Sequence, residues 1–170
     1  MKKVMVGMSG GVDSSVAALL LRNQGYDVMG VTLKLFSDED IIQAENAQKT
    51  CCALSDVEDA RSVAYKLGFE HLVFNFKDNF KEYVMNQFAE SYLCGATPNP
   101  CIECNRHIKF DKMLRRAMEL EYDYIATGHY AINEYDESRK RYLLKRSADR
   151  SKDQTYVLYS LTQNQLAHTL

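Results

Sequence analysis

The stretch VGMSGGVDSS, residues 6–15, decides the fold, because it places three glycines and three serines between a strand pattern and a helix pattern. The residues KVMVGM (3–8) form a short apolar run that ends in this stretch, which predicts a buried strand. The residues 13–25 are rich in Ala and Leu and reach a glycine at Gly25, which is typical of a helix with Asp13 or Ser14 as its N-cap. The stretch is therefore predicted to be the turn of a strand–turn–helix unit.

Three well-known glycine motifs do not explain this turn. A Walker A loop needs a lysine that is absent here, and the dinucleotide-binding G-x-G-x-x-G fails on spacing. The letters GMSGG do match the nucleophile elbow G-x-S-x-G, which would make Ser9 a hydrolase nucleophile. That fold takes an oxyanion donor from a loop after an earlier strand, and only eight residues precede Ser9. The hydrolase interpretation is therefore disfavoured.

The remaining interpretation of the turn is a phosphate-binding loop. Gly10 and Gly11 would let a ligand approach the backbone, and the helix N-terminus presents partial positive charge to an anion. The three serine hydroxyls of the stretch are further donors. Asp13 would repel phosphate oxygens unless a Mg²⁺ ion lies between them, so Asp13 is the candidate metal ligand. A simple capped turn is the alternative, but it does not need so many glycines and serines.

Strand and helix patterns alternate along the chain beyond this turn. The expected elements are strands at 27–36, 70–76 and 122–130 and helices at 57–68, 80–93 and 109–120. This alternation predicts an α/β fold with a Rossmann-like parallel sheet that helices cover on both faces. Residues 37–50 are polar and acidic and are predicted to form a mobile loop.

The pattern changes after residue 130. YAINEY and RYLLKR alternate in type around DESRK, which predicts a short antiparallel hairpin appendage, and residues 154–170 are predicted to be helical. We therefore expect a nucleotide-binding domain over 1–130, with a hairpin and helix over 131–170 that complete it. The chain stops at Leu170 without a cap or a polar tail, which predicts a piece of a longer protein.

Composition and charge favour a cytosolic protein with a local anion-binding surface. The longest apolar run, VAALLL, is far shorter than a membrane span, and the odd number of five cysteines argues against a disulfide scaffold. The net charge is −2, yet residues 106–116 and 139–152 hold twelve of the 21 basic side chains and two of the 23 acidic ones. Two solvated faces would have the same composition, so the charge pattern leaves both interpretations open.

The segment TPNPCIEC, residues 97–104, combines the only two prolines of the chain with Cys101 and Cys104. A stiff backbone there would hold a metal, a disulfide or a reacting sulfur in place. Zinc usually needs four ligands, and His107 offers only a third, so a zinc site has weak support. A thioredoxin-like redox pair belongs to a different fold from the one that the glycine turn predicts.

The segments SGGVDSS, TPNPCIECNRHIKF, ATGHY and KDQTYVL together resemble the bacterial tRNA-specific 2-thiouridylases, a family with the PP-loop of ATP pyrophosphatases. The similarity runs through essentially all 170 residues. It implies a PP-loop adenine nucleotide hydrolase fold and ATP-dependent 2-thiolation of the wobble uridine, with ATP and Mg²⁺ as cofactors. It also implies a cytoplasmic enzyme whose partners are tRNA and a persulfide donor protein of a sulfur relay. The family's tRNA-binding central domain, its C-terminal barrel and its persulfide-bearing cysteine lie in regions that this chain lacks, so we expect incomplete activity.

The resemblance also implies the site residues. The ATP-binding residues would be Gly7, Met8, Ser9, Gly10, Gly11, Val12, Asp13, Ser14, Leu33 and Gly128. The tRNA-binding residues would be Asn99, Pro100, Cys101, His129, Lys152, Asp153 and Gln154, with the Gln154 amide reading a uracil edge. Without the resemblance, Leu33 would be a core leucine, His129 a hydrogen-bonded core histidine and 152–154 an exposed helix start.

Catalysis is assigned by the same resemblance to the cysteine pair. Cys104 matches the nucleophile, and Arg106, His107 and Lys109 would favour its thiolate. Cys101 stands where many relatives carry aspartate, so a general-acid role of that aspartate does not transfer. The pair also raises the prospect of an iron–sulfur cluster with a third cysteine from elsewhere. The alternatives are another PP-loop adenylating ligase or amidotransferase with a small acceptor, and a metal-holding RNA-binding module.

Overall fold

The structure is a computed structural model that describes residues 1–36 and 54–170. Its strands are β1 (Lys3–Gly7), β2 (Asp27–Lys34), β3 (His71–Asn75), β4 (Tyr124–Thr127), β5 (Ala131–Asp136) and β6 (Arg141–Arg146). Its α-helices are α1 (Val12–Asn23), α3 (Leu54–Leu67), α4 (Lys77–Phe80), α5 (Asn86–Leu93), α6 (Pro100–Glu103), α7 (Met113–Glu119) and α8 (Gln163–Ala167). Other helical segments are the π-helices η1 (Lys81–Met85) and η2 (Cys104–Lys112) and the 3₁₀ turns η3 (Arg150–Lys152) and η4 (Thr155–Val157). The predicted loop at 37–50 and the residues Cys51 and Cys52 lie outside the described residues.

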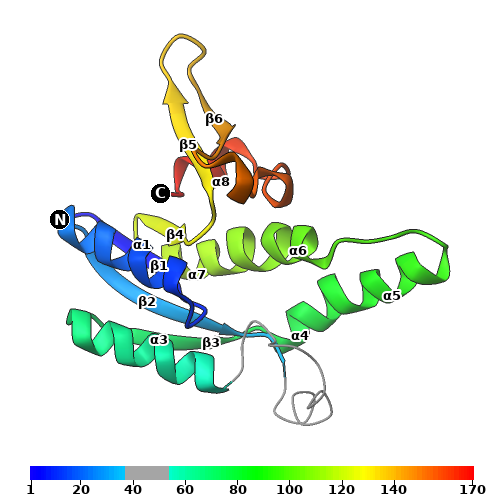
Figure 1. The fold of residues 1–170 in the computed structure, drawn as a ribbon, viewed down its shortest axis with the longest axis horizontal. Coiled ribbons are helices and arrows are strands. Elements are labelled where there is room, and N and C mark those ends of the chain that lie inside the picture. Colours follow the sequence, from blue (N-terminus) through cyan, green and yellow to red (C-terminus); the bar gives the residue numbers. More distant parts are fainter. Residues whose placement is uncertain (37–53) are drawn as a thin grey trace. The chain divides into compact units, whose positions relative to one another are not determined.

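The predicted α/β fold class is confirmed. The main sheet has the strand order β3-β2-β1-β4, and β2 runs parallel to both β1 and β3 (Figure 1). The middle residues of β1 and β2 are buried, which explains why these strands read as apolar runs rather than as alternating patterns. The strand order reverses between β1 and β4, so the switch point of the sheet, where open α/β sheets bind ligands, lies between these two strands.

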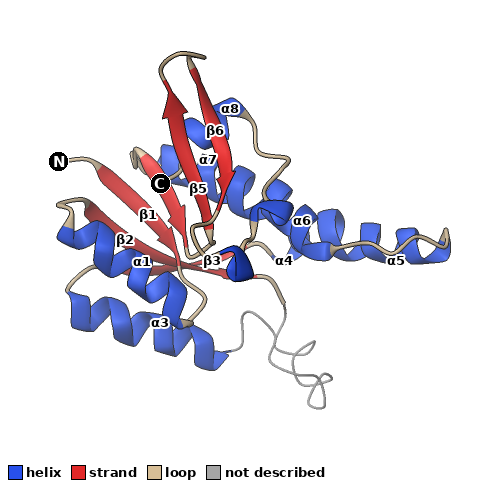
Figure 2. Ribbon diagram, turned by 45° about the horizontal axis from the view of Figure 1, so that its top comes forward, coloured by secondary structure: helices blue, strands red, loops and turns tan. Residues whose placement is uncertain are grey.

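Helices α1 and α3 pack on the same face of the sheet, as Figure 2 shows. Gly25 and Gly68, which follow these helices, have φ angles of +87° and +73°, so both predicted helix stops are confirmed. The predicted N-cap was wrong, because the capping residue is Gly11, with φ −80° and ψ 165°, and no side chain caps the helix. Asp13 instead lies inside the first turn.

The chain divides into two compact units. Unit 1 comprises Met1–Phe80 and Ala126–Gly128, and unit 2 comprises Lys81–Ile125 and His129–Leu170. These units are defined by contacts within the chain and do not test the division into domains at residue 130. That division stays a prediction. Among the described helices, none is long and apolar enough to cross a membrane.

The helix predicted at 109–120 begins earlier than expected. Helical structure runs from Pro100 through α6, η2 and α7 to Glu119 without a break, so the proline-containing loop ends at Asn99. Pro100 occupies the first helical position, where its missing N–H is tolerated, and the Asn99 side chain accepts the Cys101 N–H at 3.0 Å. Asn99 is therefore the cap of the helix that carries Cys101 and Cys104.

The C-terminal part confirms the hairpin and corrects the last helix. Strands β5 and β6 pair antiparallel in the register Asp136↔Arg141. A continuous helix over 154–170 is wrong, because this stretch forms η4 and the short α8. Thr162 starts α8 with a capping box to Gln165, so a polar helix-start signal interrupts the apolar pattern.

Candidate functional site

The glycine turn Ser9–Gly11 connects β1 to α1 in unit 1. Gly10 has a φ of +76°, a conformation that residues with a Cβ rarely adopt. A Cβ built on Gly10 would lie 2.5 Å from the carbonyl oxygen and 2.8 Å from the Cα of Asp56 in α3. The turn is therefore held directly against the first turn of a second helix, and only glycine fits at its centre.

Gly128, which follows β4, lies against the first turn of α1, next to the glycine turn. A Cβ at this position would lie 2.7 Å from the Ser14 backbone nitrogen and 2.9 Å from the Asp13 carbonyl carbon. The structure thus brings Gly128 against the first turn of α1, so predicted ATP-binding residues from two distant parts of the sequence lie together. This arrangement leaves backbone amides at the carboxyl end of the sheet, where open α/β sheets bind their ligands.

Serine hydroxyl groups form hydrogen bonds with the backbone of the turn. The Ser14 and Ser15 hydroxyls donate to the Gly11 carbonyl oxygen at 3.2 and 2.9 Å. The Ser9 backbone N–H makes only a long contact of 3.4 Å with the Ser14 hydroxyl oxygen. The side chains of Ser9 and Asp13 are exposed, so a hydroxyl and a carboxylate border the turn. These groups fit a phosphate chain that carries Mg²⁺.

Two of the predicted residues near this turn are core residues. Met8 and Leu33 are 2% and 7% exposed, which is the burial expected of core side chains. The adenine contact assigned to Leu33 stays a prediction. Sequence reasoning missed Thr32 and His71, which hydrogen-bond beneath the turn. The available signal was Thr32 itself, a polar residue in the middle of the largely apolar stretch VMGVTLKLF.

The cysteine pair lies in unit 2. Cys101 is exposed, whereas Cys104, one helical turn later, is 9% exposed, and neither is part of a disulfide. Glu103 lies between them and pairs with Arg106 at 3.3 Å and with His107 at 3.2 Å. Two of the side chains expected to favour the Cys104 thiolate are therefore already held by a carboxylate.

The described residues do not fit an iron–sulfur cluster or a zinc site at this pair. Across residues 1–36 and 54–170, no group of three or more His, Cys, Asp or Glu side chains is arranged to hold a metal ion. His107, the proposed third zinc ligand, instead stacks on Tyr83, with ring centroids 5.0 Å apart. Cys94, which we expected to be buried or incidental, is exposed at the end of α5.

His129, which follows Gly128 in the chain, is part-buried in unit 2. Its ring lies 5.9 Å from that of Phe110. Burial, and then the positive charge of Lys109, lower the pKa of His129 from 6.5 to about 4. His129 is therefore a neutral imidazole at pH 7, able to donate one hydrogen bond and accept another.

Replacing His129 with Gln is expected to remove part of the acid sensitivity of folding. Below pH 6.5 the unfolded chain protonates this imidazole, but the folded chain resists until about pH 4, so stability is complete above pH 6.5 and falls with acidification. The contribution lost between pH 7 and pH 5 is about 2 kcal/mol. Urea unfolding at both pH values measures it, and equal pH dependence in the two proteins would contradict this assignment.

The segment Lys152–Gln154 is fixed to the start of the hairpin. The Gln154 side-chain oxygen accepts the Tyr130 N–H at 2.9 Å, and the Lys152 ammonium lies 5.1 Å from the centre of the Tyr130 ring. A carboxylate oxygen of Asp153 accepts the Ser147 N–H at 2.8 Å. The amide oxygen of Gln154 is thus engaged by the backbone, which leaves its NH₂ group as the end that can meet a uracil carbonyl.

Local ion pairs offset part of the positive charge of the two basic segments. These pairs are Arg115–Asp111, Arg116–Glu119, Arg139–Asp136 and Lys145–Glu134. Exposed pairs of this kind are weak, and a polyanion can displace them. The anion-binding surface stays a prediction.

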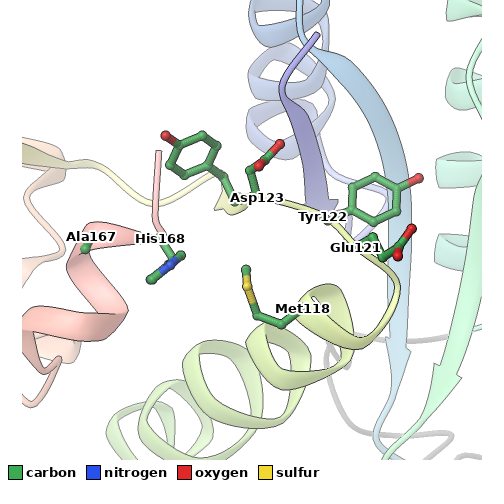
Figure 3. Close-up of a pocket in the computed structure, with 7 residues that line it drawn as sticks. Met118, Glu121, Tyr122, Asp123, Ala167 and His168 are labelled. Carbon is green, nitrogen blue, oxygen red and sulfur yellow. The ribbon is translucent and has the colours of Figure 1, made fainter.

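A pocket of about 460 Å³ lies elsewhere in unit 2 (Figure 3). Its lining comprises Met118, Glu121, Tyr122, Asp123, Tyr124, Ala167 and His168. None of these residues belongs to the predicted sites, and the carboxylates of Glu121 and Asp123 at this pocket disfavour a phosphate ligand.

Comparison with known proteins gives one family and several close relatives. The family described as tRNA methyl transferase HUP domain matches residues 2–170. The chain is 60% identical over 169 residues to a tRNA-specific 2-thiouridylase MnmA of Clostridioides difficile strain 630, a match that covers 99% of this chain and 46% of that protein. A namesake from Acetivibrio thermocellus is 58% identical over 99% of this chain and 47% of its own. The chain therefore spans about half the length of the curated relatives that it matches.

Two solved structures share the fold at low sequence identity. A predicted subunit of tRNA methyltransferase from Methanocaldococcus jannaschii aligns with a TM-score of 0.50 and 22% identity, over 75% of this chain and 53% of that one. A glutamine-dependent NAD⁺ synthetase from Acinetobacter baumannii aligns with a TM-score of 0.51 and 13% identity, over 74% and 21%. These likenesses support the Rossmann-like sheet.

Proposed function

Because the chain belongs to the tRNA methyl transferase HUP domain family, we propose that it carries the nucleotide site and the cysteine pair of a tRNA-specific 2-thiouridylase. The observation that carries this proposal is the glycine turn. The backbone of α3 lies directly against this turn, Gly128 lies against the first turn of α1 that follows it, and the turn lies beside the switch point of the sheet. The identity to named thiouridylases favours thiolation over the methyl transfer in the family's description.

The reaction divides into activation of the base and delivery of sulfur. Bound ATP with Mg²⁺ supplies an adenylyl group to the uracil O2, with loss of pyrophosphate, which turns that oxygen into a leaving group. The Ser9–Gly11 amides and the N-terminus of α1 would hold the phosphates, and Asp13 would hold Mg²⁺. Gly7 and Val12 border this turn and Gly128 lets the ligand approach, while Leu33 would contact the adenine.

Sulfur would come from a persulfide on the family's persulfide-bearing cysteine, which lies outside these residues. A donor protein would transfer the sulfur to that cysteine. The Cys104 thiolate can attack the inner sulfur of this persulfide, so that a disulfide forms and the outer sulfur leaves as hydrosulfide. Hydrosulfide then adds to C2 of the uracil, and the carbon–oxygen bond to AMP breaks. Cys101 would border the base together with Asn99 and Pro100, with no step routed through an iron–sulfur cluster.

The base and its flanking nucleotides would be held by residues of unit 2. The Gln154 NH₂ group would donate to a uracil carbonyl, and neutral His129 would add a second polar contact. Lys152 and Asp153 would contact the tRNA strand beside them. These contacts support the proposal that the partner is a tRNA, and we propose the cytoplasm as the place of the reaction.

The first experiment is calorimetry of the protein with ATP and Mg²⁺. Binding is expected for the wild type and is expected to weaken about tenfold in Gly11→Ala, because an added methyl group would occupy the space of a phosphate. A Cβ at Gly11 meets only the Ser9 hydroxyl oxygen at 3.6 Å, so folding is not disturbed. Unchanged thermal unfolding is the control, and a wild type that gives no heat with ATP and Mg²⁺ would contradict the proposed function.

A further inference from the structure

A buried pair of polar side chains lies directly beneath the glycine turn. Thr32 of β2 is 1% exposed, and its hydroxyl donates to the Met8 carbonyl oxygen at 2.8 Å. The same hydroxyl oxygen lies 2.9 Å from Nε2 of His71, at the start of β3. All three residues belong to unit 1. Met8 is the residue that immediately precedes Ser9, so this pair reaches the turn itself.

The protons of this pair can be assigned from its partners. The Thr32 hydroxyl has one hydrogen, and the Met8 carbonyl oxygen can only accept, so that hydrogen lies between them. The Thr32 oxygen must then accept, which requires a hydrogen on Nε2 of His71. Among residues 1–36 and 54–170, Nδ1 of His71 is buried and has no hydrogen-bond partner. The pKa of His71 is lowered by burial and by Arg61, which agrees with a neutral ring that is protonated only at Nε2.

The Met8 carbonyl determines how the next amide points. A trans peptide is planar, with its C=O and its N–H in opposite directions. The Met8 carbonyl points down to Thr32, so the N–H of Ser9 points away from Thr32, toward the inside of the turn. There its nitrogen lies 3.4 Å from the Ser14 hydroxyl oxygen, a contact long enough for a phosphate oxygen to replace. The Met8 N–H donates to the Val31 carbonyl at 2.8 Å, which fixes the residue from its other side.

We propose that Thr32 and His71 are positioning residues of the nucleotide site, joined in a hydrogen-bond relay that aims the Ser9 amide at a phosphate. This inference rests on the proposed function. The donors run in one direction, from His71 Nε2–H to the Thr32 hydroxyl, to the Met8 carbonyl, and through the shared peptide to the Ser9 N–H. Aligned hydrogen bonds polarise one another, so the relay strengthens the Ser9 amide as a donor as well as orienting it.

Gly30 leaves the space that the relay needs. A Cβ at Gly30 would lie 2.7 Å from the Met8 sulfur and 3.1 Å from Cδ2 of His71. Both side chains can therefore approach β2 only because this position has none. A glycine at this position is therefore required by the side chains of Met8 and His71. A strand packed against smaller core side chains would not need it.

Substitutions at Thr32 test the relay. Thr32→Val keeps the shape of the side chain but removes both hydrogen bonds, and we expect about tenfold weaker binding of ATP with Mg²⁺. Thr32→Ser keeps the hydroxyl and is expected to bind within about threefold of the wild type. Val28→Ala is the control for lost stability, because Val28 is buried near the start of β2, four residues before Thr32. This variant should keep the wild-type affinity for ATP. Equal affinities of Thr32→Val and wild type would overturn the relay.

His71 gives an independent readout that a merely structural role would not move. Nitrogen-15 NMR of the wild type is expected to show a neutral ring with its hydrogen on Nε2, and an Nδ1–H ring would overturn the assignment. His71→Gln, which can still donate to Thr32, should bind ATP better than His71→Leu. If the wild type binds no ATP, the proposed function itself fails. If it binds and these variants do not differ, only the relay fails.

Discussion

The Gly10→Ala protein is expected to bind ATP at least about 100-fold more weakly than the wild type. Two independent penalties act at this position. Its φ of +76° is unfavourable for alanine, and the new Cβ would lie 2.5 Å from the Asp56 carbonyl oxygen. That neighbour is backbone in the first turn of α3, so it has no rotamer by which to move aside. The turn must change its path, and the amides that would meet the phosphates move with it.

Gly25→Ala is the matched control for this substitution. Gly25 has a similar φ of +87°, but a Cβ there meets nothing within 4 Å. It should therefore show only the left-handed penalty, roughly 1–2 kcal/mol of stability, with unchanged affinity for ATP. Calorimetry and thermal unfolding of both variants separate the two penalties. Equal ATP affinity in Gly10→Ala and wild type would mean that the turn is not the phosphate site.

The parallel sheet and the glycine turn could be predicted because both leave local signals in the sequence. An apolar run followed by Gly, Ser and Asp marks the end of a buried strand and the start of a helix within about ten residues. The stops at Gly25 and Gly68 are equally local, since a positive φ is needed at one position. The inclusion of Gly128 among the ATP-binding residues was implied by the family resemblance, and its place beside α1 agrees with the rule that ligands bind at the switch point.

The features that sequence reasoning missed depend on partners far away in the chain. Thr32 and His71 form a pair only because β2 and β3 are neighbours in the sheet, so the polar residue inside the apolar strand does not by itself identify its partner. The helix that carries the cysteines starts early because Asn99 caps it and Pro100 occupies its first position. In the sequence, two prolines so close together are more typical of a loop. The hydrogen bond that the Gln154 side-chain oxygen accepts likewise comes from a distant residue, the backbone N–H of Tyr130, 24 residues away.

Cys104→Ser is expected to abolish thiolation of tRNA, with a loss on the order of 1,000-fold or more, in a protein extended to the length of the relatives. A serine hydroxyl is a far weaker nucleophile toward a persulfide than a thiolate, and the change is nearly isosteric. Cys104 is 9% exposed and sits one turn inside a capped helix, so its sulfur is held in place and shielded from solvent. Thiolated nucleosides in digested tRNA, measured by mass spectrometry, give the readout.

The design separates sulfur transfer from adenylation, because the two steps use different residues. Pyrophosphate release in the presence of tRNA should persist in Cys104→Ser, since no thiol takes part in the attack on ATP. Cys94→Ser is the matched control, because Cys94 is a free, exposed thiol outside the Cys101–Cys104 pair, and this variant should keep full activity. Retained thiolation in Cys104→Ser would assign the nucleophile to another residue, with Cys101 as the next candidate. Loss of both activities would instead indicate that the substitution disturbs the binding of tRNA.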